Sequence, residues 1–172
     1  LSEKEPPMFK LQPGATLKNL QLECALDGIH TTRNNKIQNI INRDVEEDAI
    51  TIGTNITIEN SEFWFCQDKC LQMNSASTAT IRNNKFYHAT SPMKANTGRN
   101  IRVEGNQFYN VRKAIRAAES VSSIYAKNNV AKRADCFMSA EIKALIVDEG
   151  GNLQSSVSKK HCTENGGKIS VK

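Results

Sequence analysis

The chain has 172 residues, which is enough for one domain with a buried core. Its aromatic fraction of 6% argues against a sandwich or bundle with a broad aromatic core and suits a thin core of small aliphatic residues. The formal net charge of +5 favours a polyanionic partner. However, we find no nucleic-acid-binding signature and no apolar run of about 18 residues. We therefore expect a monomeric domain that binds neither nucleic acid nor membranes.

The five cysteines indicate an oxidising environment. They are Cys24, Cys66, Cys70, Cys136 and Cys162, and their odd number predicts one or two disulfides with at least one thiol left over. A bond between Cys136 and Cys162 would tie down the C-terminal segment, and one between Cys66 and Cys70 would close a turn, but neither pairing follows from the sequence. The chain does not begin with Met, as expected of a mature secreted product, and we expect an extracellular location.

A six-residue motif, apolar-x-Asn-x-x-apolar, recurs along the chain. It occupies residues 17–22, 37–42, 58–63, 81–86, 103–108 and 125–130, so successive copies lie 20 to 23 residues apart. A unit of this length cannot bury its apolar face alone, but stacked units can. Leucine-rich repeats need Leu at several fixed sites, and Leu is sparse here. The repeat therefore predicts an all-β, single-domain, right-handed parallel β-helix of about six to eight coils.

The predicted elements follow the chain as one domain over residues 1–172. Residues 1–13 contain three prolines and are expected to form an irregular N-terminal cover. Residues 14–147 form the coils, with a last strand over 142–147. Residues 148–172 lack the motif and are expected to form a loose C-terminal tail.

The repeated Asn is typical of a turn, because Asn tolerates left-handed backbone and bonds its neighbours. These residues, with Gly in one slot, are Asn19, Asn39, Asn60, Asn83, Gly105 and Asn128. Stacked on one another, they are expected to form an inward ladder of amide hydrogen bonds. Alternation within the strands predicts a set of inner-face residues beside the ladder. They are Ile50, Ile52, Ile56, Ile58, Ala79, Ile81, Ile101, Val103, Ile124 and Tyr125.

Because the coils stack, a fixed offset from the end of the motif marks one column in space. Offset five gives Asp27, Glu47, Asp68, Ser91, Lys113 and Asp135; offset six adds Asp48 and Lys69; offset eight adds His30, Lys94 and Arg116. Acids on consecutive coils would lie roughly 5 Å apart and would repel each other unless a cation lay among them. Oxygen ligands at this spacing favour Ca²⁺ over zinc. The bases beside them could receive carboxylates, although a solvated polar face remains the alternative.

Several short strings, in this order, resemble family 3 polysaccharide lyases. They are residues 14–20 (GATLKNL), 27–30 (DGIH), 47–49 (EDA) and 68–69 (DK). The resemblance covers roughly residues 12 to 135. These lyases are secreted pectate lyases, so it implies a small parallel β-helix, Ca²⁺, and cleavage of polygalacturonate, an acidic polysaccharide, by β-elimination.

The resemblance also implies roles for individual residues. The positions that match the calcium-binding acids are Asp27, Glu47, Asp48 and Asp68. Lys69 matches the lysine proposed as the Brønsted base. The family then shows a Lys and an Arg, three residues apart, that bind substrate. Here those places hold Ser91 and Lys94, and Lys113 or Arg116 on the next coil could supply the missing charge. Substrate binding is therefore expected at Lys94, Lys113 and Arg116.

Other interpretations remain open. Ser91 and Lys94 favour a β-helix that binds acidic glycan without cleaving it, whereas the acids and Lys69 favour the lyase. Paired carboxylates also permit hydrolysis, but the neighbouring lysine favours elimination. His30 is interpreted as a supporting residue, because no nucleophile motif accompanies it. Trp64 and its neighbour Phe63 are interpreted as packing residues, with a sugar-stacking platform as the alternative.

Overall fold

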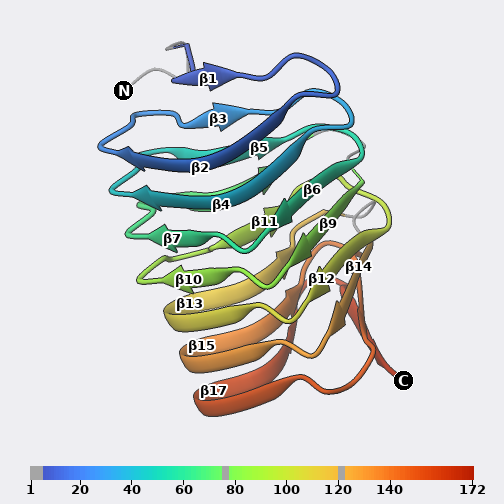
Figure 1. The fold of residues 1–172 in the computed structure, drawn as a ribbon. Coiled ribbons are helices and arrows are strands. Elements are labelled where there is room, and N and C mark those ends of the chain that lie inside the picture. Colours follow the sequence, from blue (N-terminus) through green and yellow to red (C-terminus); the bar gives the residue numbers. More distant parts are fainter. Residues whose placement is uncertain (1–5, 75–77, 120–122) are drawn as a thin grey trace.

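The computed structural model describes residues 6–74, 78–119 and 123–172 of the chain. In these residues it is an all-β parallel solenoid of about seven turns without helices, which confirms the predicted parallel β-helix (Figure 1). None of the described residues belongs to a helix that could cross a membrane.

Each coil contributes strands to three faces, which we name A, B and C in chain order. Face A contains β6 (Ile56–Glu59), β9 (Ala79–Arg82), β12 (Ile101–Glu104), β14 (Ser123–Lys127), β16 (Leu145–Asp148) and β18 (Lys168–Val171). Face B contains β7 (Glu62–Trp64) and β10 (Lys85–Tyr87). Face C contains β1 (Phe9–Lys10), β3 (Ile29–His30), β5 (Asp48–Ile52), β8 (Lys69–Met73) and β11 (Met93–Ala95).

The longer strands run around a corner of the coil. β2 (Thr16–Glu23) and β4 (Lys36–Arg43) pass from face A to face B. β13 (Gln107–Ala117), β15 (Val130–Ala140) and β17 (Leu153–Thr163) pass from face B to face C. Every strand pairing in the described part of the chain is parallel and joins residues of neighbouring coils.

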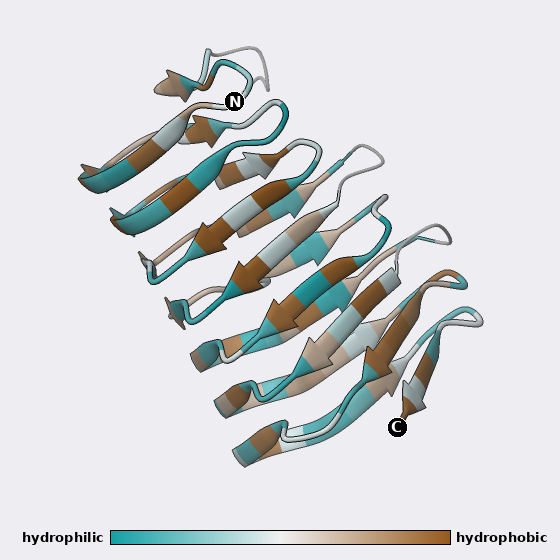
Figure 2. Ribbon diagram, turned by 45° about the vertical axis from the view of Figure 1, so that its right-hand side comes forward, coloured by the Kyte–Doolittle hydropathy of each residue, from teal (hydrophilic) through white to brown (hydrophobic). Residues whose placement is uncertain are grey.

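The core is a narrow column of aliphatic and aromatic side chains. Hydrophobic residues recur at equivalent positions of stacked strands (Figure 2). Phe63, Phe86 and Phe108 are fully buried and stack with ring centroids 5.0 Å apart at each step. The predicted inner-face residues are buried with one exception: Tyr125 points outward beneath Arg102, and Ala126 takes the inner position. Ile124 and Tyr125 are neighbours and both apolar, so alternation alone did not predict which of the two faces the core.

The repeated Asn residues do adopt left-handed backbone, as predicted. Their φ values lie between 51° and 56°, and Gly105 has φ 64° in the same slot. The inward amide ladder, however, belongs to the following residue, which corrects the prediction. It consists of Ser61, Asn84, Asn106, Asn129 and Asn152, and each Asn side chain accepts a hydrogen bond from the backbone N–H of the preceding coil. Because the backbone turns at the left-handed residue, the side chain of that residue faces solvent and the side chain of the next residue faces the core.

Both ends of the chain are more regular than predicted. Residues 148–172 are not a loose tail, because β17 and β18 add another coil paired to β15 and β16. The motif is hidden there because Gly151 replaces the left-handed Asn, while Asn152 continues the ladder. At the other end, β1 pairs with β3 within the expected irregular cover.

Two disulfides form, Cys66–Cys70 and Cys136–Cys162, and Cys24 is free and exposed. This result agrees with the expectation of one or two bonds and a leftover thiol. The second bond joins β15 to β17 and so fastens the last coil to the one before it.

Candidate active site

The acidic residues lie on face C in the N-terminal coils. Their alignment between coils differs by one residue from the predicted column. Asp48 pairs directly with Lys69 on the next coil. The N–H of Gly28 donates to the carbonyl of Asp48 at 3.0 Å, which aligns Asp27 with Asp48 and not, as predicted, with Glu47. Paired residues Ile29 and Ile50 are 21 positions apart, one more than the spacing of the motif between these two coils. A constant offset from the motif therefore aligns Asp27 one residue away from its true neighbour.

Lys69 is buried between two carboxylates of this cluster. Its Nζ lies 3.3 Å from Asp48 Oδ1 and also contacts Asp68 Oδ2. Asp48 and Lys69 are only 8% and 7% exposed. Burial raises the pKa of Asp48 to about 6, with the charges of Asp68 and Asp27 acting in the same direction and Lys69 opposing them. Lys69 is thus the cation that holds these two carboxylates together.

Asp27 lies on the other side of Asp48 and is bonded to His30. The Nε2 of His30 is 2.6 Å from Asp27 Oδ2, and the imidazole is held at the mouth of the acidic cluster by this contact. The supporting role predicted for His30 is compatible with this geometry and stays a prediction.

A pocket of about 190 Å³ opens among these side chains. It is lined by Asp27, His30, Glu47, Asp48, Thr51, Gln72 and Asn74. Among the described residues, two buried oxygens at the pocket have no hydrogen-bond donor, Asp27 Oδ1 and Gln72 Oε1, and Asp48 Oδ1 has only the ion pair with Lys69 at 3.3 Å. Buried acceptors without donors cost free energy, so this pocket suits a ligand that offers positive charge or protons.

The donor set fits a hard cation. Carboxylate and amide oxygens are the ligands that Ca²⁺ prefers, and four acids are more negative charge than Lys69 alone can balance. Among the residues that the structure describes, no three His, Cys, Asp or Glu side chains converge on one point. Asp48 and Asp68 turn toward Lys69, and Asp27 turns toward His30. The carboxylates would therefore have to rotate to share a cation.

The cationic residues lie on the same face, toward the C-terminal coils. Lys94 and Arg116 are directly paired, and Gln72, Thr51 and His30 continue their column, as the offset of eight predicts for His30, Lys94 and Arg116. Burial lowers the pKa of Lys94, and the charges of Arg116 and Lys69 lower it further.

A second column brings Ser91 and Lys113 together. The N–H of Lys113 donates to the carbonyl of Thr90 at 3.0 Å, which aligns Lys113 with Ser91, as predicted. On the next coil it pairs with Cys136 and not with the predicted Asp135, because this step takes 23 residues. A Lys and an Arg spaced by three, Lys113 and Arg116, therefore lie one coil beyond Ser91 and Lys94.

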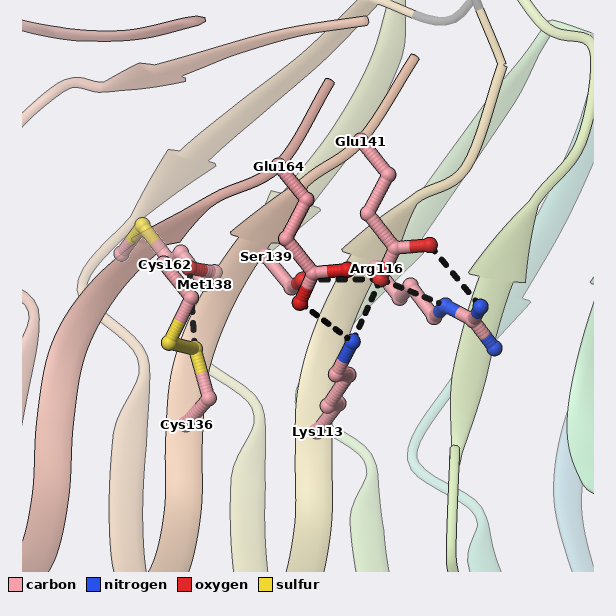
Figure 3. The surroundings of a disulfide bond; sticks show 8 residues. All are labelled: Lys113, Arg116, Cys136, Met138, Ser139, Glu141, Cys162 and Glu164. Carbon is pink, nitrogen blue, oxygen red and sulfur yellow. Dashed lines mark hydrogen bonds and ion pairs between the residues drawn. A yellow bond between two sulfur atoms is a disulfide. The ribbon is translucent and has the colours of Figure 1, made fainter. Parts of the chain in front are cut away.

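Sequence reasoning missed a partner that neutralises these two cations. Glu141 Oε1 lies 2.6 Å from Lys113 Nζ, and Glu141 Oε2 lies 2.8 Å from Arg116 Nη2 (Figure 3). Glu164 adds a second carboxylate 3.2 Å from Lys113. Burial raises the pKa of Glu141, but hydrogen bonds from Arg116 and Lys113 outweigh it and lower the pKa to about 2.

Gln72, Asn74 and Glu141 are the site residues that the sequence did not reveal. Gln72 could have been found from the sequence, because it lies in the same column as Lys94. We did not predict it, because its side chain is neutral and the prediction was based on charged residues. Glu141 had none, because it follows the last motif and reaches its partners across 28 and 25 residues of sequence.

Comparison with known families agrees with this arrangement. The family model described as pectate lyase matches residues 2–165, which is nearly the whole chain and includes every residue of the acidic cluster and its neighbouring cations. No solved structure matches the chain. The repeat, the acidic pocket beside Lys69 and this match together show that the chain belongs to the pectate lyase family.

Proposed function

We propose that this protein is a secreted pectate lyase that cleaves polygalacturonate by calcium-dependent β-elimination, with Lys69 as the Brønsted base. The observation that carries the proposal is the pocket on face C, where buried oxygens of Asp27 and Gln72 without hydrogen-bond donors lie beside the ion pair of Asp48 and the buried Lys69. Membership of the pectate lyase family and two disulfides are consistent with this substrate and with secretion.

The location of Lys69 beside the pocket supports its proposed role as the base. Lys69 is buried but contacts carboxylates that line or flank the pocket, so its Nζ is held near the pocket mouth. Elimination removes the weakly acidic proton beside a uronate carboxylate, and the lysine must be neutral to accept it. While Asp48 and Asp68 contact Lys69 Nζ, the amine is engaged by these carboxylates and is not free to reach a substrate. Activity therefore requires that these carboxylates turn away from the amine.

Asp27, Glu47, Asp48 and Asp68 are the residues that would hold Ca²⁺. When bound, the cation would neutralise the substrate carboxylate and the charge that develops next to it. Gln72 supplies a neutral oxygen at the same pocket. Engagement of the acids with a cation would also free Lys69 from the contacts that it makes with Asp48 and Asp68.

Lys94, Lys113 and Arg116 are proposed to bind uronate carboxylates. Lys94 is half-buried, and the nearby Arg116 and Lys69 disfavour its charge, so an added carboxylate at this point would be stabilised. Lys113 and Arg116 are already paired with Glu141. A substrate carboxylate would therefore compete with, or extend, that existing ion-pair network.

The test is ultraviolet absorbance of unsaturated products during incubation with polygalacturonate and Ca²⁺ at alkaline pH. We expect the absorbance to rise, the rise to vanish in chelator, and Lys69→Ala to lower the rate by at least about a hundredfold. Lys85→Ala is the matched control, because Lys85 pairs with Glu62 on face B, away from the pocket. Activity that survives Lys69→Ala would show that Lys69 is not the base.

A second candidate function is binding of acidic glycan without cleavage. The observation that favours it is Glu141, which neutralises Lys113 and Arg116, together with Ser91, whose buried hydroxyl has no hydrogen-bond partner among the residues that the structure describes. Binding of polygalacturonate with no absorbance rise across alkaline pH would establish this function and exclude the lyase.

A further inference from the structure

A column of left-handed residues marks the corner between faces B and C. Its members, one from each coil, are Cys24, Asp44, Phe65, His88, Asn110, Arg133 and Ser156, with φ between 51° and 56°. We call it the B–C corner. It precedes the strands of face C and so flanks the acidic pocket without belonging to it.

The B–C corner uses side chains that this backbone conformation disfavours. Residues with a bulky Cβ substituent pay roughly 1 kcal/mol or more in the left-handed region, which Gly and Asn occupy most readily. At the corner between faces A and B the chain obeys that preference with Asn or Gly in every described coil from Asn19 to Gly151. Phe65, His88 and Arg133 do not obey it. Backbone strain that persists against an available alternative marks positions where the side chain is needed.

These side chains form an exposed aromatic surface. Phe65 is 47% exposed, and its ring stacks on His88 with centroids 4.9 Å apart. His88 Nδ1 lies 2.8 Å from the side-chain amide of Asn110. Beside them on face B, Trp64 stacks on Tyr87 at 3.8 Å. Rings within a stack expose only their edges. Trp64 and Phe65 stand at the ends of their stacks, so one face of each ring points toward the coil that carries Arg43 and Asp44.

Three hollows follow this surface across successive coils. The first, about 260 Å³, is lined by Arg43, Asp44, Trp64 and Phe65. The second, about 290 Å³, is lined by His88, Tyr109, Asn110, Lys132 and Arg133. The third, about 440 Å³, shares His88, Asn110 and Arg133 with the second and adds Thr90, Arg112 and Asp135 among others. The Phe65–His88 stack lies between the first hollow and the other two, and we call the three hollows together the groove.

The groove has uncompensated positive charge. Four cations line it, Arg43, Arg112, Lys132 and Arg133, against two carboxylates, Asp44 and Asp135. Arg43 is paired with Glu23 at 3.6 Å, so the excess positive charge comes from the other three cations. Within the described part of the chain, Arg112, Lys132 and Arg133 make no ion pair, and Lys132 instead lies 5.6 Å above the Tyr109 ring. This differs from face C, where Glu141 pairs with both Lys113 and Arg116.

We propose that the groove along the B–C corner is a second binding site, for a saccharide chain that carries carboxylates. Aromatic edges and end faces pack against the apolar side of a sugar ring, and guanidinium groups bind carboxylates. A chain that runs along the helix axis meets a new corner residue about every 4.8 Å. The choice of an acidic saccharide rests on the proposed function, but the site is separate from the pocket on face C.

The test compares binding and stability in the same variants. All are made in a Lys69→Ala background so that cleavage does not interfere, and polygalacturonate is the titrant in calorimetry. The combined variant Phe65→Asn, His88→Asn and Arg133→Asn installs at three coils the residue that Asn110 already provides. We expect the affinity of the groove, resolved beside binding at the pocket on face C, to fall at least tenfold, while the thermal midpoint holds or rises because strain is relieved. Ser156→Asn, at the same corner but outside the groove, is the matched control.

The opposite result has a clear meaning. If the three side chains serve packing alone, the combined variant will melt earlier and bind polygalacturonate as before, and the proposal is overturned. Arg112→Gln, which leaves the ring stacks intact, must also weaken binding, and unchanged affinity in this variant would equally overturn it. Failure of the proposed lyase function appears separately, as absent unsaturated product from the unmodified protein.

Discussion

Glu141→Gln tests how much the ion-pair network at the end of face C contributes to folding. Glutamine keeps the shape of Glu141 but removes the charge that faces Lys113 and Arg116. The side chain of Glu141 is only 8% exposed, so solvent does little to replace the lost charge. Removing one partner of a buried ion pair leaves the remaining charges uncompensated, which destabilises the folded state.

The magnitude follows from the pKa of Glu141. Interactions that lower it from 4.5 to about 2 correspond to about 3 kcal/mol in favour of the charged form when the protein is folded. Glu164 still faces Lys113 in the variant and offsets part of the loss. We expect Glu141→Gln to lower the free energy of unfolding by about 2 kcal/mol at pH 7.

The pH dependence provides the sharper test. Because the folded pKa is depressed, the stabilisation is fully present above the ordinary pKa of 4.5 and is lost as pH falls toward about 2. Urea unfolding followed by circular dichroism should show a large difference between wild type and variant at pH 7 and a small one near pH 2.5. Glu164→Gln is the control, and because Glu164 is 53% exposed its loss should cost under about 1 kcal/mol. Equal differences at both pH values would refute the reasoning.

The remaining predictions concern the ladder, the disulfide and the cation. Asn106→Ala leaves the ladder donors of Asn84 and the carbonyl of Ile81 unpaired, so we expect the free energy of unfolding in urea to fall by about 3 kcal/mol or more. Asn83→Gly, at an exposed left-handed turn, should change it by no more than about 1 kcal/mol. Cys162→Ser opens a loop with a sequence separation of 26 and should cost about 3.5 kcal/mol on chain-entropy grounds, with Cys24→Ser as a neutral control. Ca²⁺ should raise the thermal midpoint of the wild type and raise that of Asp27→Asn much less; an equal rise in both would remove Asp27 from the proposed ligands.

The sequence predicted the parallel β-helix because that fold repeats its chemistry at every coil. A residue at one corner must always turn left-handed, so Asn or Gly recurs at intervals near 22, and the apolar positions recur with it. The same spacing correctly predicted the column of His30, Lys94 and Arg116. Local conformational preference and period were therefore sufficient for the architecture and for the neighbourhood of the site.

The tertiary structure decided what depends on register and on distant partners. Hydrogen bonds between coils set the alignment of Asp27 with Asp48, because corners of differing length absorb single residues that a constant offset cannot see. The left-handed turn decided that Asn106 faces inward and its neighbour outward. Glu141, at the end of β15, closes over Lys113 and Arg116 of the preceding coil, a contact between residues far apart in the chain. Such pairings leave no periodic trace in the sequence, because they arise once, where coils meet in space.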